Sequence, residues 1–183
     1  PEYLHSYELN YKKNIGEQVL QSSLFYRSRK DKIERLRVPY EAGVTLDSMA
    51  NVGNDHALGM ELSGQFIVNK WWNLNVNGNV YYYKVVNNIN AGGKEETSTN
   101  YDITVNNLLR ICKNTRIQLD GNFVGPSVTT QGRSDSFWFV NLAIRQQWFG
   151  SNLQSTLSFR DIFNSARYKN DITPPNLESV THI

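Results

Sequence analysis

The chain has 183 residues, enough for one domain or for part of a larger one. Lys and Arg number 19 against 17 Asp and Glu, and this net charge of +2 gives no reason to expect nucleic acid or an acidic substrate as a partner. No window approaches the ~18 apolar residues that a transmembrane helix needs, so any membrane crossing must be made by strands.

About eight segments alternate apolar and polar residues with the period of two that is typical of β-strands. They span residues 3–11, 18–28, 57–69, 71–85, 101–111, 116–124, 136–148 and 152–160. In the fourth segment every second residue from Asn73 to Asn79 is asparagine, while Leu74, Val76 and Val80 share the opposite face. The sequence therefore predicts an all-β, antiparallel up-and-down meander with no helix.

The polar faces of these segments carry charges that suit a solvated surface and not a packed core, among them Glu61, Asp102 and Arg110. We interpret the meander as part of a transmembrane β-barrel with a wet lumen. The residues expected on the lipid-facing surface are Leu74, Val76, Val80, Leu119, Val140, Leu142 and Leu157. Those expected on the inner surface are Asn73, Asn75, Asn77, Asp120 and Arg145.

The connections between segments alternate strictly between short and long. Tight turns are expected at 14–17, 69–71, 113–114 and 149–151, and long polar loops at 30–54, 87–100 and 126–135, with a tail after Asp161. All tight turns would then lie at one end of the sheet, as the short periplasmic turns of outer-membrane barrels do.

Aromatic residues gather at both strand ends, as expected where strands leave hydrocarbon. Trp71, Trp72, Trp148 and Phe149 belong to the tight-turn end, and Tyr81 to Tyr83, Tyr101, Phe137 and Trp138 to the long-loop end. Alternation alone also fits a soluble lipocalin-like barrel, whose apolar face lines a pocket for a small apolar ligand. The aromatic residues at both strand ends and the charges on the polar face together favour a membrane barrel over a soluble one.

Four motifs in order resemble TonB-dependent outer-membrane receptors, in particular those of Bacteroidetes. They are PEYLHSYELNYK (1–12), NVGN with GMELSG (51–64), GPSVTTQG (125–132) and RDIFN (160–164). The resemblance implies a barrel of about 22 strands with an N-terminal plug, in the bacterial outer membrane. It implies that residues 1–183 are a C-terminal part of that barrel, without the plug, the TonB-binding box and the last hairpin.

By this resemblance the protein imports an unknown nutrient: its partners are outer-membrane lipid, the remaining strands and plug, and TonB through the plug. Siderophore, cobalamin, glycan and peptide importers share such barrels, so the ligand stays open. A porin or adhesin without a plug is a weaker alternative. If the chain contributes to ligand binding, the expected contacts come from the long loops, with Tyr40 and Arg133 as candidates because aromatic and guanidinium groups commonly anchor interfaces.

The sequence contains no catalytic constellation, and we expect neither an enzyme nor a cofactor. His5, His56 and His182 lack metal-ligand spacing, so no metal site is expected. Cys112 is alone, which excludes a disulfide framework. The charged run 27–37 is interpreted as a solvated outside loop, with contact to anionic lipopolysaccharide or to an acidic ligand as the alternative. Open sheet edges are costly in lipid, so the first and last strands are expected to pair with strands outside this sequence.

Overall fold

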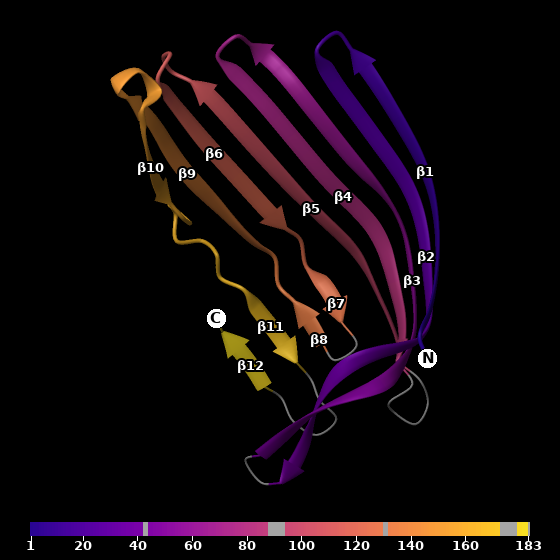
Figure 1. Cartoon of the computed structure of the whole chain (residues 1–183). Helices are drawn as coiled ribbons and strands as arrows, with labels where there is room; N and C mark the ends of the chain where they lie inside the picture. The colour runs from indigo at the N-terminus through magenta and orange to yellow at the C-terminus, as the bar shows by residue number, and fades with distance from the viewer. Residues whose placement is uncertain (42–43, 88–93, 130–131, 173–178, 183) are drawn as a thin grey trace.

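The computed structural model describes residues 1–41, 44–87, 94–129, 132–172 and 179–182. Its main feature is an eight-stranded antiparallel sheet with the order β1-β2-β3-β4-β5-β6-β9-β10 (Figure 1). The strands are β1 (Tyr3–Ile15), β2 (Gln18–Glu41), β3 (Val44–Asn69), β4 (Trp72–Asn87), β5 (Lys94–Arg110), β6 (Thr115–Val124), β9 (Phe137–Trp148) and β10 (Leu153–Phe159). The predicted fold class, an all-β antiparallel meander, is confirmed.

All four tight turns lie at one end of this sheet, as predicted (Figure 1). Two of them use a glycine with positive φ: Gly16 at 61° between β1 and β2, and Gly150 at 65° between β9 and β10. Glycine adopts this conformation without the steric penalty that a side chain adds. The turn between β9 and β10 contains the 3-10 helix η1 (Phe149–Ser151). No helix in the described ranges is long and apolar enough to cross a membrane.

The opposite end differs from the predicted long loops, because much of it forms strands. Residues 30–41 and 44–54 continue β2 and β3, and residues 94–100 begin β5. The segment after β6 forms β7 (Ser127–Thr129) and β8 (Gly132–Ser134), which pair with β11 (Lys169–Ile172) and β12 (Ser179–His182) in a second sheet of order β12-β11-β8-β7. Strand pairing satisfies backbone groups that a loop would leave to water. Residues 42–43, 88–93 and 130–131 of the predicted loops lie outside the described residues.

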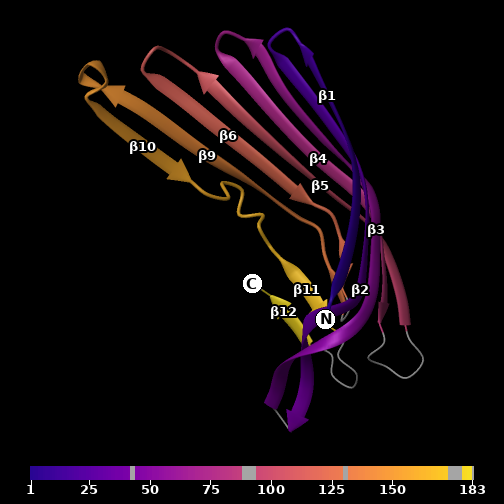
Figure 2. The same cartoon turned by 45° about the vertical axis from the view of Figure 1, so that its right-hand side comes forward.

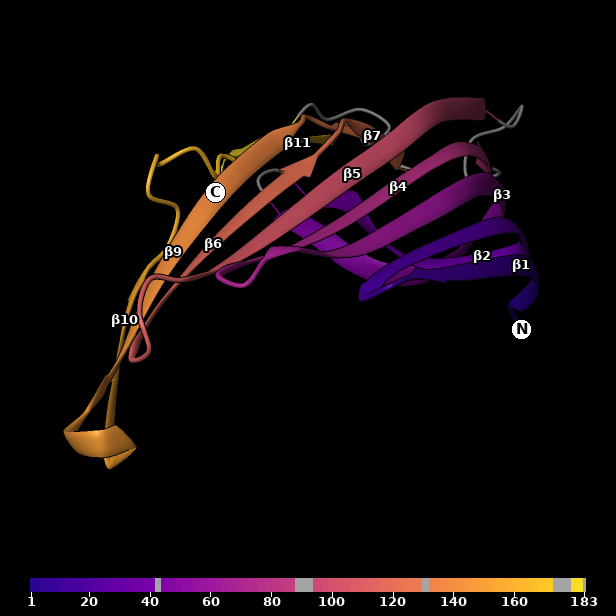
Figure 3. The same ribbon diagram turned by 90° about the horizontal axis from the view of Figure 1, so that it is seen from above.

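The outer part of the β2–β3 hairpin bends away from the line of the two strands (Figure 2). The bend coincides with register shifts between Arg29 and Lys32 and between Lys32 and Ile33. Asp31 has a φ of 54° and Gly53 a φ of 131°, both outside the extended region. Register shifts of this kind are β-bulges, which bend a pair of strands and increase its twist. Seen from above, the eight strands follow an arc, and the bent hairpin turns toward the inside of that arc (Figure 3).

The two ends of the sheet are packed differently, and we name them the wall and the mouth. The mouth begins at the cross-strand row Phe25, Gly59, Tyr81 and Asn100 and contains everything beyond it on the side of the second sheet; the wall is the part between this row and the tight turns. The buried hydrophobic residues of the described chain all lie in the mouth: Phe25, Leu36, Val52, Val85 and Val128. The wall therefore has no hydrophobic core of its own.

The wall exposes its apolar side chains instead. Leu62 and Val80 are 50% and 42% exposed, and Leu157 is 57% exposed. These residues share the predicted lipid-facing surface, opposite the asparagines. Polar residues also occur on this face, and one of them is Asn107, which pairs with Leu74 and Leu119. Its side chain accepts a hydrogen bond from Trp72 Nε1 (3.1 Å) and donates one to the Leu119 carbonyl (3.3 Å), so its amide is satisfied on this face.

The aromatic belt predicted at the long-loop end is half wrong. Tyr82, Tyr101 and Trp138 lie on the apolar face and are 50%, 44% and 44% exposed. Tyr81 and Tyr83 point to the other face, and so does Phe137, whose ring lies against Tyr168 at 5.6 Å. The reason is the strand period itself, since consecutive aromatic residues in a strand take opposite faces.

Candidate functional site

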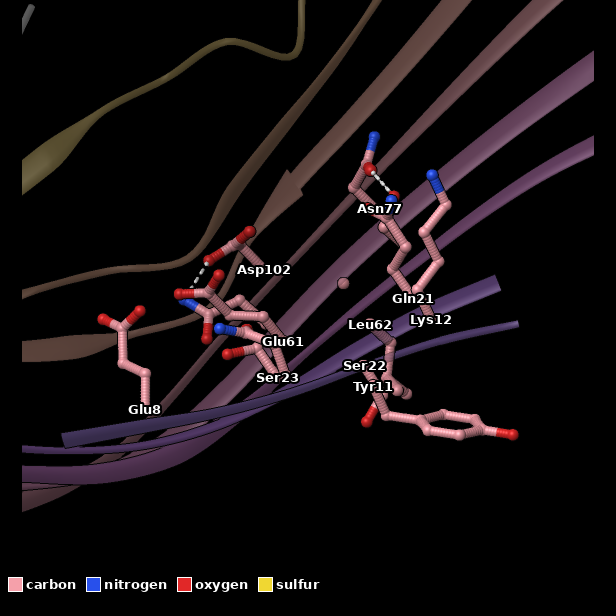
Figure 4. A pocket seen from close by; sticks show the side chains of 14 residues that line it. Glu8, Tyr11, Lys12, Gln21, Ser22, Ser23, Glu61, Leu62, Asn77 and Asp102 are labelled. Atoms are coloured by element: carbon pink, nitrogen blue, oxygen red, sulfur yellow. Dashed lines mark hydrogen bonds between the residues drawn. The ribbon is translucent and has the colours of Figure 1, made fainter. Parts of the chain in front are cut away.

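The inner, polar face of the wall is hollowed. A hollow of about 560 Å³ is lined by residues of β1 to β5 (Figure 4), and its polar side chains include those of Glu8, Lys12, Gln21, Ser23, Glu61, Asn77 and Asp102. These residues lie on the polar face. The strands follow an arc (Figure 3), and a hollow bordered by five strands of one curved sheet lies on its concave side, so the apolar face is the convex one. The predicted facing of Asn77 is thereby confirmed.

Neighbouring strands are joined across this face by side-chain hydrogen bonds. Ser63 donates to Asn77 (2.8 Å), and Asn79 donates to Asp102 (3.3 Å). Further along, Asn106 donates to Asp120 (3.0 Å) and Asn122 to Thr104 (2.9 Å). The asparagine face predicted from the sequence is thus one part of a polar ladder that runs from β3 to β6. An amide can donate and accept at once, which explains its repeated use here.

One group of charged side chains on the inner face surrounds Arg27. Its guanidinium lies 3.1 Å from Glu8 Oε1 and 3.8 Å from Glu61 Oε1, with all three side chains between 43% and 49% exposed. The same guanidinium stands over the Phe25 ring at 4.4 Å from the ring centroid. Asp102 lies on the same hollow, so carboxylates outnumber cations around it.

Beyond Arg27 the mouth contains a buried ionic and aromatic cluster, which we name the mouth cluster: Lys32, Asp55, Tyr83, Tyr81 and Phe25. Lys32 and Asp55 are 8% and 7% exposed. Lys32 Nζ lies 3.0 Å from Asp55 Oδ2 and donates to Tyr83 Oη at 2.9 Å, while Tyr83 Oη donates to Asp55 Oδ2 at 2.9 Å. Lys32 also pairs with Glu34.

The aromatic members of the cluster pack against one another, next to the ionic triangle that Lys32, Asp55 and the Tyr83 hydroxyl form. The Phe25 and Tyr81 ring centroids are 6.1 Å apart, and Tyr81 meets Tyr83 edge to face at 6.5 Å. Gly59 allows this packing, because a Cβ there would stand 2.3 Å from Tyr81 Cβ and 2.8 Å from Phe25 Cζ. The cluster thus connects β2, β3 and β4 at the point where the β2–β3 hairpin bends.

The electrostatics of the cluster follow from burial and close partners. For Lys32, burial opposes the charge, but hydrogen bonds to Glu34, Tyr83 and Asp55 outweigh it, so the pKa of Lys32 is raised. Burial raises the pKa of Tyr83 to about 12, although the neighbouring Lys32 acts in the opposite direction. At neutral pH the cluster therefore holds a charged lysine and a protonated phenol.

The two ligand-binding residues proposed from the sequence lie elsewhere. Tyr40 is near the end of β2 and is 68% exposed. Arg133 is on β8, with a 71% exposed side chain 3.6 Å from Glu96. Both are on the mouth but on different elements, and neither lines the hollow. The structure does not test whether they bind a ligand.

The charged run 27–37 is not the solvated loop that the sequence predicted. It forms strand β2, and its Lys32 is buried. Sequence reasoning missed the mouth cluster because its members come from three strands whose register is broken by a bulge. An available signal was the run itself: eight charged residues within 11 positions are unusual for a strand.

The three histidines fall on separate strands, β1, β3 and β12. His56 Nδ1 lies 3.2 Å from Tyr26 Oη, an ordinary side-chain contact. Among the residues that the structure describes, no group of three or more His, Cys, Asp or Glu side chains is placed to hold a metal ion. Cys112 is an exposed free thiol at the β5–β6 turn.

The two outermost strands, β1 and β10, are not paired with each other in the described sheet. The eight strands therefore form an open, curved sheet and not a small closed barrel. The pairing of β1 and β10 with strands outside this sequence is not tested by the structure and stays a prediction.

Comparison with known proteins agrees with this geometry. The ferric yersiniabactin uptake receptor FyuA from Yersinia pestis has a similar structure, with a TM-score of 0.69 and 20% sequence identity over 98% of this chain. The chain corresponds to 28% of that receptor's length, and at this identity the similarity concerns the fold. No curated protein matches. Residues 1–182 match the model of the outer membrane protein beta-barrel family, so the chain belongs to this family and its place is the bacterial outer membrane.

Proposed function

We propose that this chain forms part of the wall and mouth of a TonB-dependent receptor that imports a nutrient across the outer membrane. The observation that carries the proposal is the hydrogen-bonded polar hollow on the concave face of a sheet whose convex face is apolar. The soluble-barrel alternative requires the opposite arrangement, with the apolar face lining the interior.

In this proposal the hollow faces a plug domain of the same receptor. The exposed carboxylates Glu8 and Glu61 and the amide of Asn77 offer hydrogen-bond acceptors to a polar partner and no apolar patch. A plug held by such contacts can be displaced without exposing hydrophobic surface. TonB would act on the plug and not on the residues of this chain.

The proposal also assigns the chain to the C-terminal part of the barrel, with further strands on both edges. The free edges of β1 and β10 carry backbone groups that would be unsatisfied in lipid, at several kcal/mol each. Neighbouring strands of the same receptor remove this cost. No enzymatic step is proposed.

Nutrient import is tested by deleting the gene and comparing growth on a panel of scarce nutrients: ferric siderophores, cobalamin, glycans and peptides. Loss of growth on one class, repeated when TonB is removed, supports the proposal. Unchanged growth on every class, or uptake that continues without TonB, contradicts it and favours a porin or an adhesin.

Ligand contact at the mouth is tested with Tyr40→Ala and Arg133→Ala in the full-length receptor. Both side chains are largely exposed, so the variants should fold, and reduced uptake would indicate a direct contact. Deleting residues 88–98 without any change in uptake would exclude the β4–β5 connection from the binding site.

A further inference from the structure

The lipid-facing surface is not smooth, because a groove lies across three of its strands. The groove has a volume of about 260 Å³ and lies across β5, β6 and β9. Six residues of the apolar face form it: Ile103, Val105, Gly121, Phe123, Trp138 and Val140. In the sheet register, Val105, Gly121 and Val140 form one row, and Ile103, Phe123 and Trp138 form the next row toward the mouth.

Gly121 is the reason that the groove exists. A Cβ at this position would meet no atom within 4 Å, so the space above it is empty of protein. Its row neighbours Val105 and Val140 are branched and stand on either side as walls. Trp138 forms the end of the groove nearest the mouth and is 44% exposed, with its ring 5.8 Å from that of Phe163.

The groove lacks polar side chains. Asn122 and Phe139 also contribute to its lining, but strand alternation turns their side chains to the inner face. For Asn122 this is confirmed by its hydrogen bond to Thr104, 2.9 Å away on the polar ladder. Only backbone therefore reaches the groove from these two residues.

The groove lies in the half of the membrane that faces the mouth. Gly121 is seven positions into β6, counted from Thr115 beside the tight turn, and a tilted strand crosses hydrocarbon in about 9–11 residues. At its outer end the Phe123 ring is stacked on that of Tyr101, 5.9 Å away, and Tyr101 is one of the aromatic residues exposed on this face. Tight turns of such barrels are periplasmic, so this half corresponds to the outer leaflet.

We propose that the groove seats one acyl chain of an outer-leaflet lipid. Membership of the outer-membrane family places this face against lipid, and the groove is continuous with that face. A protein partner would need a much larger surface than the six side chains of this groove, since a stable protein interface uses about 20–30 residues on each side. A small-molecule site would be expected to carry a few polar groups that orient the ligand, and here the side chains supply none.

The proposal is tested with the full-length protein in phosphatidylethanolamine vesicles that contain a phospholipid with a photoactivatable diazirine in one acyl chain. After illumination, the labelled peptides are identified by mass spectrometry. Label is expected to be several-fold enriched at residues 103–105, 121–123 and 138–140 over the smooth part of the face around Leu157. Gly121→Leu fills the groove and should remove this enrichment.

The matched control is Gly78→Leu. Gly78 also lies on the apolar face, in the row of Leu62 and Ile103, and a Cβ there would meet only the Asp102 carbonyl oxygen, at 3.8 Å. It does not line the groove, so the control should keep the labelling pattern of the unmodified protein.

Three results would overturn the proposal: label spread evenly over the apolar face, equal enrichment in Gly121→Leu and the unmodified protein, or a protein cross-linked over the groove in native membranes. If Gly121→Leu does not assemble, Trp138→Ala provides the test, because removing the end of the groove should also lower the enrichment. Unchanged enrichment in that variant would count against an acyl chain bound in the groove. The inference depends on membrane placement and not on nutrient import.

Discussion

The wall and the mouth are built from the same strands and held together by different forces. In the wall, β2, β3 and β4 alternate regularly, bury no hydrophobic side chain and leave their apolar face to lipid. In the mouth, the continuation of these strands buries Lys32 and Asp55 together with Val52 and Val85, both of which are fully buried. Water surrounds the mouth, so it needs a small core of its own, whereas the lipid serves the wall as an apolar solvent.

This difference teaches where each part is vulnerable. The wall should tolerate any change that preserves the facing of its side chains and fail when a charge enters the apolar face. The mouth should fail when Lys32 or Asp55 loses the other, because a buried ion without a partner is far more costly than an absent pair.

The largest effect is expected for Asp55→Ala. It leaves the buried Lys32 ammonium without its carboxylate at 3.0 Å and Tyr83 Oη without its acceptor at 2.9 Å. Removing one partner of a buried pair costs about 3–5 kcal/mol. Hydrogen exchange should therefore accelerate by roughly two orders of magnitude or more in residues 32–36 and 46–53, with little change in the wall.

The double variant Lys32→Met with Asp55→Leu is its control. Replacing both ions by apolar groups of similar size is often close to neutral, so protection of the hairpin should largely return. Equal exchange in the single and double variants would mean that the ionic triangle does not hold the bend.

A charge on the apolar face tests the wall. Val76→Arg places a guanidinium on the lipid side of β4, four residues from the start of the strand at Trp72, and should reduce stability in a bilayer by about 2–4 kcal/mol if this site is near the midplane. Asn75→Arg, one residue away on the inner face, should have a much smaller effect. Chemical unfolding from vesicles measures both, and equal losses would contradict the assigned facing.

Adding a single methyl group at a glycine compares the packing of the mouth, at Gly59, with that of the wall, at Gly121. Gly59→Ala forces a Cβ to within 2.3 Å of Tyr81 Cβ and 2.5 Å of the Val80 carbonyl oxygen, which should destabilise the protein by about 1–3 kcal/mol. Gly121→Ala has open space and should be neutral or slightly stabilising. Melting temperatures in detergent measure the difference, and a Gly59→Ala variant as stable as Gly121→Ala would argue against close packing in the mouth cluster.

The smallest effect is expected for the Tyr83 hydroxyl. Tyr83→Phe removes two hydrogen bonds, the one donated to Asp55 and the one accepted from Lys32. Lys32 and Asp55 keep each other as partners, so the change should cost only about 1 kcal/mol, or somewhat more where Asp55 is left with one donor fewer. Because the folded pKa of Tyr83 is raised, its contribution is complete below the unfolded value of about 10 and is lost as the pH rises through about 12. The tyrosinate absorbance difference between the original protein and Tyr83→Phe should accordingly develop near pH 12, and a difference centred near pH 10 would contradict this burial.

Sequence periodicity is sufficient to predict the strands and the facing of the wall, because a single requirement orders it: apolar side chains on one face and polar side chains on the other. Asn73 to Val80 alternate without interruption, and their register with β3 contains no shift between Ile67 and Gly53. The mouth could not be read in the same way. Lys32 follows a bulge, and its partners Asp55 and Tyr83 are 23 and 51 positions away in the chain. The sequence predicts neither the position of a bulge nor the pairing beyond it, so its charge pattern alone indicates a solvated loop.

The order of the strands has a consequence for how the sheet folds. Every pairing in the eight-stranded sheet joins strands that follow each other in the chain, except β6 with β9, which are separated only by the short β7–β8 hairpin. Each new strand therefore adds to an existing edge at a small cost in loop-closure entropy. Such a low contact order favours fast folding that proceeds hairpin by hairpin, starting from the tight turns. A mutation that disfavours one turn, such as Gly16→Val at a φ of 61°, should delay the addition of one hairpin and leave the pairing of the others unchanged.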